Sequence, residues 1–290
     1  MSPKTIDFIG IGTAKSASTW VFRCLSEHPE VCASRRKEMR FFDNPHNFKK
    51  GLKWYFSFFP EPQPGQITGE FSPSYIYSRE TAQRIRDTFP HVKLIAVFRN
   101  PVDKIYSSFW SNKTGGRGSL VMFNTIEDAI REIDGMLDPA LHGRQLQEYL
   151  NIFPKEQIYT IIYDDIRENP ERAMQGVYQF LGIDDSFVAP STHRSVNETG
   201  DKRIKYPLLF TIIYSAYWKI RKFSWIRKLI KSMNGTGVSV ALSRFGTERG
   251  GEKVIKPAMN PETRRRLKDF YTEDVLLLER LIGRDLSAWK

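Results

Sequence analysis

The sequence has few cysteines and no long hydrophobic run, and each shortage excludes a class of protein. Only two cysteines, Cys24 and Cys32, occur in 290 residues, too few for a disulfide framework, and no metal-ligand spacing surrounds them. We expect both to be thiols in a hydrophobic core. No apolar run approaches the roughly 20 residues that span a bilayer, and residues 1–7 show no secretory leader. A soluble, cytoplasmic protein is therefore expected.

Acidic residues are outnumbered by basic ones. The chain holds 44 Lys and Arg against 33 Asp and Glu, which gives a formal net charge of +11. Such an excess favours anionic partners, such as nucleotides, sulfate or phosphate esters, acidic glycans, nucleic acid or lipid headgroups. The charge by itself is also compatible with a protein that merely has one basic face.

Short apolar runs alternate with helical stretches along the chain. Strands are predicted over residues 8–12, 66–71, 92–98 and 158–163. Helices are predicted from a cap at Ser18 or Thr19 to His28, from Pro101 onward, over 170–181, and from Pro261 to Gly283. Strands that are nearly all apolar and alternate with helices indicate an α/β fold with a central parallel sheet flanked by helices.

The first predicted strand leads into "GIGTAKSASTW", from Gly10 to Trp20. This is not the loop of nucleotide triphosphatases, because Lys15 has no glycine before it. The start of a helix presents free N–H groups and a positive dipole end, which suit a phosphate. Lys15 adds a charge, and Ser16, Ser18 and Thr19 add hydroxyls. Taken alone, the stretch is equally compatible with an ordinary strand–helix turn.

A second stretch, "VFRNPVDKIYSSF", ends a predicted strand at Arg99 and places Ser107 eight residues later. An arginine fork and a serine hydroxyl can hold a second phosphate, although Arg99 could instead pair with an acid at the core edge. Parallel sheets bind ligands beyond the carboxyl ends of their strands. Since Lys15, Glu70 and Arg99 each lie at or just past a predicted strand end, we expect them on the same edge.

Together the two stretches resemble sulfotransferases that use 3′-phosphoadenosine 5′-phosphosulfate (PAPS). That family has a strand–loop–helix similar to G-x-x-K-x-G-T-T-x-L, matched here from Gly12 to Trp20, and a strand-end arginine followed by a serine, matched by Arg99 and Ser107. "KEMRFFD", "GEFSPSYIY" and the tail from Met259 resemble further segments of heparan-sulfate-type and bacterial members. The resemblance covers nearly the whole chain.

The resemblance implies a three-layer, P-loop-like fold and transfer of a sulfuryl group from PAPS with no required metal. Lys15 would stabilise the leaving phosphate oxygen, and Glu70 would accept the acceptor's proton. A structural alternative for Glu70 is a carboxylate paired with Lys37 or Arg40. The residues implied to contact PAPS are Thr13, Ala14, Lys15, Ser16, Ala17, Ser18, Thr19, Trp20, Arg99 and Ser107.

The chain departs from the family pattern at several positions. The resemblance implies that Arg40 and Phe71 face the acceptor. Lys37 is a further candidate, which could contact sulfate oxygens or the acceptor or be a solvated side chain, and His193, beside Arg194, is a candidate acceptor contact. Phe71 stands where many relatives have lysine, Arg40 where many have histidine, Lys104 replaces a common arginine, and Ala17 replaces a glycine. None of these changes removes a group that the transfer requires. The expected acceptor is a hydroxyl, in preference to an amine, of a glycan or a small natural product.

One domain over 1–290 is expected, with a core at about 5–190 and 252–290 and a helical lid at about 191–251. The basic, aromatic segment 204–231 is compatible with an acceptor wall, a packed subdomain or peripheral membrane contact. No nucleic-acid partner is expected, although alternating aromatic and basic residues are also used by proteins that bind single-stranded nucleic acid. Two other functions fit parts of the sequence: a P-loop kinase-like enzyme, and a non-catalytic protein that binds anionic membranes or nucleic acid.

Overall fold

The computed structural model describes residues 5–114, 120, 123–194, 202–204, 247–249 and 256–290. The chain forms two compact units. The first comprises Met1–Lys104, Pro139–Asn197 and Arg266–Lys290, and the second comprises Ile105–Asp138 and Glu198–Arg265. Most of the predicted lid, and all but one residue of the segment 204–231, lie outside the described residues.

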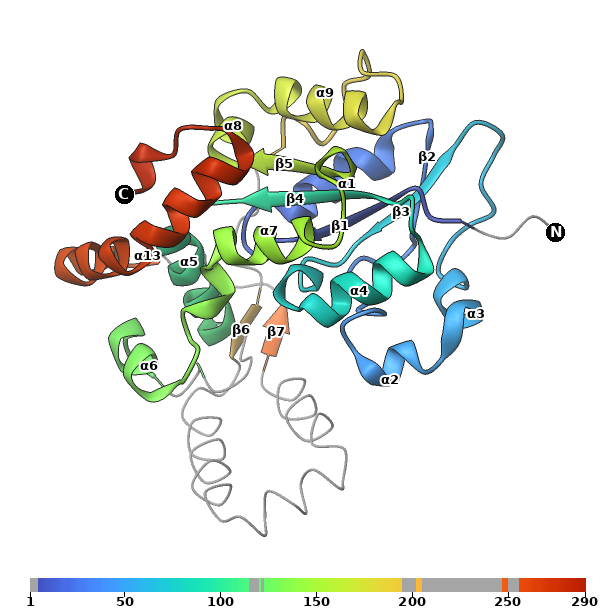
Figure 1. Ribbon diagram of the computed structural model, residues 1–290. Coiled ribbons are helices and arrows are strands. Elements are labelled where there is room, and N and C mark those ends of the chain that lie inside the picture. Colours follow the sequence, from blue (N-terminus) through green and yellow to red (C-terminus); the bar gives the residue numbers. More distant parts are fainter. Residues whose placement is uncertain (1–4, 115–119, 121–122, 195–201, 205–246, 250–255) are drawn as a thin grey trace, which may run out of the picture. The chain divides into compact units, whose positions relative to one another are not determined.

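A parallel sheet in the first unit carries the fold (Figure 1). Its strands are β1 (Phe8–Gly12), β2 (Val31–Ala33), β3 (Ile67–Phe71), β4 (Lys93–Phe98) and β5 (Ile158–Ile162), in the order β2-β3-β1-β4-β5. All neighbouring pairs are parallel. The predicted α/β fold is thus confirmed, and the four predicted strands agree with the structure to within one residue at each end. The three-residue strand β2 was not predicted.

Helices cover both faces of this sheet, which explains why the strands are almost wholly apolar. On one face, α1 (Ser18–Glu27) and α9 (Pro170–Leu181) pack their apolar sides against Phe8, Val97 and Ile161. On the other face, Figure 1 shows α4 (Arg79–Thr88) and α7 (His142–Leu150). Every residue of β1 is buried. Both cysteines are free and buried, as expected.

The remaining elements are short, apart from two helices. They are α2 (Pro45–Phe48), α3 (Gly51–Phe56), α5 (Pro101–Thr114), α6 (Ile126–Glu132), α8 (Tyr163–Glu168), α13 (Pro261–Ile282), and the 3-10 turns η1 (Tyr75–Tyr77), η3 (Asp138–Ala140), η4 (Lys155–Gln157) and η5 (Ser287–Trp289). In the second unit, β6 (Lys202–Ile204) pairs antiparallel with β7 (Thr247–Arg249). Among the described residues, no helix has the length and apolar character needed to cross a membrane.

The start of α1 differs from the prediction. The residue that caps the helix is Ala17, with a left-handed backbone at φ 68°, and its side chain makes no cap hydrogen bond. The predicted caps, Ser18 and Thr19, are instead the first residues of the helix. The prediction was wrong because propensity favours a hydroxyl at the cap, whereas here the tight turn out of β1 determines where the helix begins.

Helices α7 and α13 meet at a glycine. A Cβ atom at Gly143 would lie 2.4 Å from the carbonyl oxygen of Asp274 and 3.0 Å from the nitrogen of Leu278. The Asp274 carboxylate accepts hydrogen bonds from the backbone N–H of Gly143 and Arg144, both at 2.9 Å. Asp274 therefore satisfies the first N–H groups of α7 from a neighbouring helix, at a distance that only glycine permits.

We expect Gly143→Ala to lower the free energy of unfolding by about 3 kcal/mol, because the backbone of α13 must move to admit the methyl group. Gly176→Ala is the matched control. There the added Cβ meets the hydroxyl of Tyr159, which is the movable end of a side chain, so a much smaller loss is expected. Urea unfolding of both variants measures the difference, and equal losses would contradict the close packing of α7 on α13.

Candidate active site

The loop between β1 and α1, residues Thr13 to Ala17, has a backbone suited to an anion. Lys15 and Ala17 both adopt left-handed conformations, each with φ 68°, while Ser16 between them does not. Within the described residues, the N–H groups of Ser16, Ala17, Ser18 and Thr19 donate to no backbone carbonyl. Successive free N–H groups at a helix start form a concave anion-binding nest.

Buried side chains hold this β1–α1 loop in place. The Thr13 hydroxyl donates to the Val97 carbonyl at 2.9 Å and lies 2.7 Å from the Ser16 hydroxyl. Thr13 and Ser16 are both fully buried. These two hydroxyls are therefore used in fixing the loop to β4, and the half-buried Thr19 and the backbone are left to face a ligand.

The structure brings Arg99 to the same loop. The guanidinium of Arg99 donates to the carbonyl of Lys15 at 3.1 Å and lies 4.4 Å from the ring centroid of Tyr163. The Nε2–H of His142 donates to the Arg99 carbonyl at 3.1 Å. Neighbouring strands β1 and β4 explain this arrangement, because their carboxyl ends lie side by side. Ser107 belongs to the second compact unit, and its pairing with Arg99 stays a prediction.

A second cation lies at the start of α1. The ammonium of Lys37 is 3.5 Å from the Ser18 hydroxyl and 2.9 Å from the Glu38 carboxylate. It also lies 5.9 Å from the ring centroid of Phe71. Lys37 was predicted from its motif alone, and the structure places it beside the β1–α1 loop.

Glu70 is enclosed by hydroxyl groups. Its side chain is 0% exposed, and its two oxygens accept hydrogen bonds from Ser72 at 2.7 Å, Tyr75 at 2.8 Å and Tyr55 at 3.5 Å. Burial is the main cause that raises the pKa of Glu70 to about 7, against the opposing hydrogen bonds from Ser72 and Tyr75. A carboxyl group in this range is suited to take up and release a proton near neutral pH.

The ion pairs considered for Glu70 from the sequence are made by other acids. Lys37 pairs with Glu38, and Arg40 pairs with Asp43 at 3.0 Å. The backbone N–H of Arg40 donates to the Ser72 hydroxyl at 3.3 Å, and that hydroxyl in turn donates to Glu70. Arg40 thus reaches the carboxylate through one intervening side chain.

Other predicted residues lie away from the loop or inside the core. Phe71 is fully buried, and its ring occupies the space that a Cβ at Gly10 would need. The buried indole of Trp20 donates to the Ser191 carbonyl at 3.0 Å. The His193 side chain is 66% exposed and lies 3.3 Å from Glu171 of α9. Ala17 can offer a ligand its backbone N–H group.

Sequence reasoning missed three residues around this edge of the sheet. Tyr77 lies near the backbone of Ala14, and burial raises the pKa of its hydroxyl to about 12. Lys104 is 1% exposed and lies 5.2 Å from the ring centroid of Tyr77. His142 is buried beneath Arg99, and burial followed by the charge of Lys104 lowers the pKa of His142 to about 3. Only Lys104 carried a signal, as a departure from the family's arginine.

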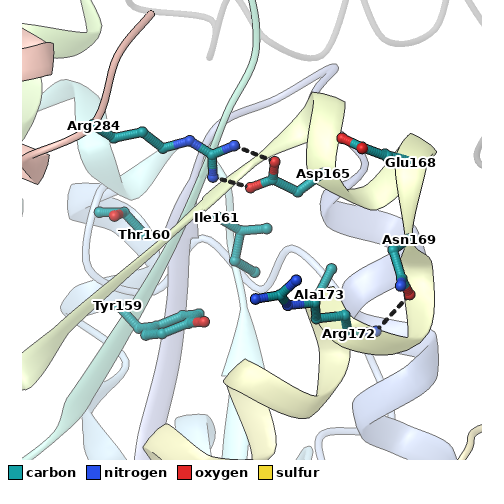
Figure 2. Close-up of a pocket in the computed structure, with 9 residues that line it drawn as sticks. All are labelled: Tyr159, Thr160, Ile161, Asp165, Glu168, Asn169, Arg172, Ala173 and Arg284. Carbon is teal, nitrogen blue, oxygen red and sulfur yellow. Dashed lines mark hydrogen bonds and ion pairs between the residues drawn. The ribbon is translucent and has the colours of Figure 1, made fainter.

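A separate pocket of about 660 Å³ lies along β5, α8 and α9 (Figure 2). The lining residues are Tyr159, Thr160, Ile161, Asp165, Glu168, Asn169, Arg172, Ala173 and Arg284. None of the predicted site residues lines it. Asp165 makes a two-pronged ion pair with Arg284, and Asp164 accepts a 2.9 Å hydrogen bond from the Trp289 indole. These acids hold the C-terminal segment. Across the described residues, no group of three metal-ligating side chains occurs.

Comparisons with known proteins identify a family for the chain. The model of the sulfotransferase domain family matches residues 5–278. Bifunctional heparan sulfate N-deacetylase/N-sulfotransferase 2 of Homo sapiens is 30% identical over 195 residues, which are 61% of this chain and 22% of that protein. Heparan sulfate glucosamine 3-O-sulfotransferase 6 of Homo sapiens is 32% identical over 182 residues, 60% of this chain and 51% of that protein.

The chain thus spans between about a fifth and about half of the length of these curated relatives. Among solved structures, a sulfotransferase from Alicyclobacillus acidocaldarius superposes with a TM-score of 0.67 at 21% identity and covers 99% of both chains. At that identity the likeness shows a shared fold. Since the family model covers nearly the whole sequence, the resemblance seen in the motifs is confirmed: this chain belongs to the sulfotransferase domain family.

Proposed function

We propose that the protein transfers a sulfuryl group from PAPS to a hydroxyl group of a glycan or a small natural product. The observation that carries this proposal is the β1–α1 loop. Among the described residues, its N–H groups from Ser16 to Thr19 donate to no backbone carbonyl, and two cations contact the loop, Lys37 at the Ser18 hydroxyl and Arg99 at the Lys15 carbonyl. The N–H groups and Lys37 suit a phosphosulfate group, and Arg99 is left for a second phosphate. PAPS, when bound, supplies the activated sulfuryl group.

The residues of the loop then have separate tasks. The N–H groups from Ser16 to Thr19 bind and orient the 5′-phosphate. Lys15 stabilises negative charge on the phosphate oxygen that leaves sulfur. In phosphoryl transfer, and by analogy in sulfuryl transfer, the protein acts mainly by positioning the reacting groups and by stabilising charge in the transition state. Arg99, with Ser107 as the predicted second contact, binds the 3′-phosphate.

Glu70 is proposed to accept the proton of the acceptor hydroxyl as the new oxygen–sulfur bond forms. Its raised pKa suits this task. Because the carboxyl group is wholly buried in the described structure, the proposal requires acceptor binding to open a path to it. The Ser72 hydroxyl, 2.7 Å from Glu70, is the group through which a proton could pass over the shortest distance.

A glycan acceptor is supported by the relatives, two of which are named for acting on heparan sulfate. The backbone of Arg40 contacts the hydroxyl network of Glu70, and its exposed guanidinium, paired with Asp43, is a cation on the same segment. A cation there suits an acceptor that carries negative charge. A small natural product fits the same chemistry, since the transfer needs one hydroxyl group on either acceptor.

Arg99→Met tests the donor assignment. The ratio of the Kd of adenosine 5′-monophosphate to that of adenosine 3′,5′-bisphosphate should fall about 100-fold, because charge-assisted bonds to the 3′-phosphate are lost. Loss of the bond from Arg99 to the Lys15 carbonyl should affect both nucleotides equally, so the ratio isolates the 3′-phosphate. Titration calorimetry without magnesium measures both constants. Tighter binding of magnesium–ATP than of the bisphosphate would contradict the proposal.

A further inference from the structure

The backbone carbonyl of Arg99 is held by a buried histidine. Arg99 directly follows β4, whose last pair with β5 joins Phe98 to Ile162. Among the described residues, no backbone N–H donates to the Arg99 carbonyl. The Nε2–H of His142 donates to it instead, at 3.1 Å. Because a carbonyl oxygen only accepts hydrogen bonds, the ring nitrogen of His142 that faces it must carry the proton.

The ring of His142 lies in an enclosed site. His142 is 1% exposed, and its ring centroid lies 5.1 Å from that of Phe98. Its other ring nitrogen, Nδ1, is buried and has no hydrogen-bond partner in the part of the chain that the structure describes. Burying a polar group costs free energy unless a hydrogen bond compensates. A phenylalanine would fill the same space without that cost, so the contact with Arg99 is what a histidine adds here.

The start of α7, which carries His142, is fixed in turn by α13. The Asp274 carboxylate accepts hydrogen bonds from the backbone N–H groups of Gly143 and Arg144, both at 2.9 Å. These two residues directly follow His142. Asp274 is buried, and hydrogen bonds shielded from water are electrostatically stronger than exposed ones. The first turn of α7 is therefore firmly seated, and it holds the imidazole of His142 against the end of β4.

The direction of the Arg99 carbonyl matters because it belongs to the peptide that leads from β4 into α5. The next side chain, Asn100, caps α5 by accepting a hydrogen bond from the N–H of Val102 at 3.0 Å. The Arg99 guanidinium donates to the Lys15 carbonyl at 3.1 Å, and a two-pronged arginine contact depends on its direction. Without its donor, the Arg99 carbonyl would turn toward another partner, and the guanidinium would shift with the backbone.

We propose that His142, seated by Asp274, is a positioning residue for Arg99 and thereby maintains a preference for nucleotides that carry a 3′-phosphate. Both residues act through the end of β4 and neither contacts the donor. This inference rests on the proposed function, in which Arg99 binds the 3′-phosphate. It assigns part of the donor specificity to α7, on the face of the sheet opposite α1.

Titration calorimetry of the full chain with adenosine 5′-monophosphate and with adenosine 3′,5′-bisphosphate tests this role. His142→Phe keeps a ring beside Phe98 and removes the N–H donor. The ratio of the Kd of the monophosphate to that of the bisphosphate should therefore fall about tenfold. His142→Gln offers an amide N–H at a similar reach and should keep the ratio within about threefold of the wild type.

His28→Phe is the matched control for a general loss of stability. His28 is also buried, and its Nε2 lies 2.9 Å from the Asp184 carbonyl. The Glu30 N–H donates to its Nδ1 at 3.1 Å, so this variant loses at least as many hydrogen bonds as His142→Phe. His28 lies at the end of α1 away from the β1–α1 loop. Its melting temperature should fall at least as far as that of His142→Phe, while the Kd ratio should stay that of the wild type.

The double variant Arg99→Met with His142→Phe shows whether His142 acts through Arg99. Once the guanidinium is gone, His142→Phe should lower the Kd ratio no further, since both changes act on one contact. A further fall in the double variant would mean that His142 acts by another route, and the inference would be wrong.

The other contrary results have distinct meanings. If the wild type prefers the bisphosphate and His142→Phe keeps that preference, the positioning role is wrong while the proposed function stands. A wild type without that preference overturns both. Equal falls in His142→Phe and His142→Gln, or in His142→Phe and His28→Phe, would show that the ratio does not depend on the bond to Arg99. If His142→Phe does not fold, Asp274→Asn decides: it removes one acceptor oxygen from the start of α7 and should lower the ratio about threefold, and an unchanged ratio overturns the inference.

Discussion

Lys15→Met should lower turnover about 1,000-fold, because the charge proposed to stabilise the leaving phosphate oxygen is removed. The substitution keeps the aliphatic part of the side chain at a half-buried loop position. We therefore expect the melting temperature to stay within about 2 °C of the wild type. Initial rates with radiolabelled PAPS measure the loss once an acceptor has been found in fractionated glycans or small-molecule extracts.

Two controls separate this effect from general loss of positive charge. Lys53→Met removes an exposed cation on α3 and should leave turnover unchanged. Affinity of Lys15→Met for adenosine 3′,5′-bisphosphate should fall less than about tenfold, because the loop N–H groups and Arg99 remain. A variant that retains more than a tenth of wild-type turnover would rule out the role assigned to Lys15.

Glu70→Gln should lower turnover by a factor of about 100 to 10,000, the usual contribution of a general base. Affinity for adenosine 3′,5′-bisphosphate should be unaltered, since the proposed base acts on the acceptor alone. Equal losses in turnover and in nucleotide affinity would instead identify Glu70 as a structural carboxylate. A structural role is compatible with the three hydroxyl groups that donate to Glu70. Comparing the loss in turnover with the loss in nucleotide affinity distinguishes the two roles.

The same variant should change how stability depends on pH. The pKa of Glu70 is raised from 4.5 to about 7 in the folded protein, so the folded state binds more protons than the unfolded state between these values. The free energy of unfolding should therefore fall by roughly 3 kcal/mol as pH rises from 4.5 to 7 through this one group. Urea unfolding at pH 5 and pH 8 should show this fall in the wild type and a smaller one in Glu70→Gln.

Much of the sheet could be predicted because its strands are continuous apolar runs. Helices cover both faces of the sheet, so successive residues of β1 and β4 are apolar and do not alternate with polar ones. That pattern predicts a buried strand. The starts of α9 and α13 were also clear, since Asn169 and Asn260 precede prolines and accept hydrogen bonds from the backbone of Arg172 and Glu262. Strand β2 escaped prediction because three residues carry too little pattern.

The site was predictable where it depends on strand ends and unpredictable where it depends on distant side chains. Arg99 and the loop of Lys15 meet because β1 and β4 are neighbours, which follows from the fold. The enclosure of Glu70 depends on Tyr55, which lies on α3 and has no fixed spacing from it in the sequence. Likewise, no local pattern indicates that Thr13 donates to Val97.

The left-handed residues of the β1–α1 loop have a consequence for the thermodynamics of ligand binding. Lys15 and Ala17 carry side chains where glycine would be freer to move, so the loop samples fewer shapes before it meets the nucleotide. Less conformational entropy then remains to be lost on association. Nucleotide binding should therefore have a small entropic penalty and a high association rate constant.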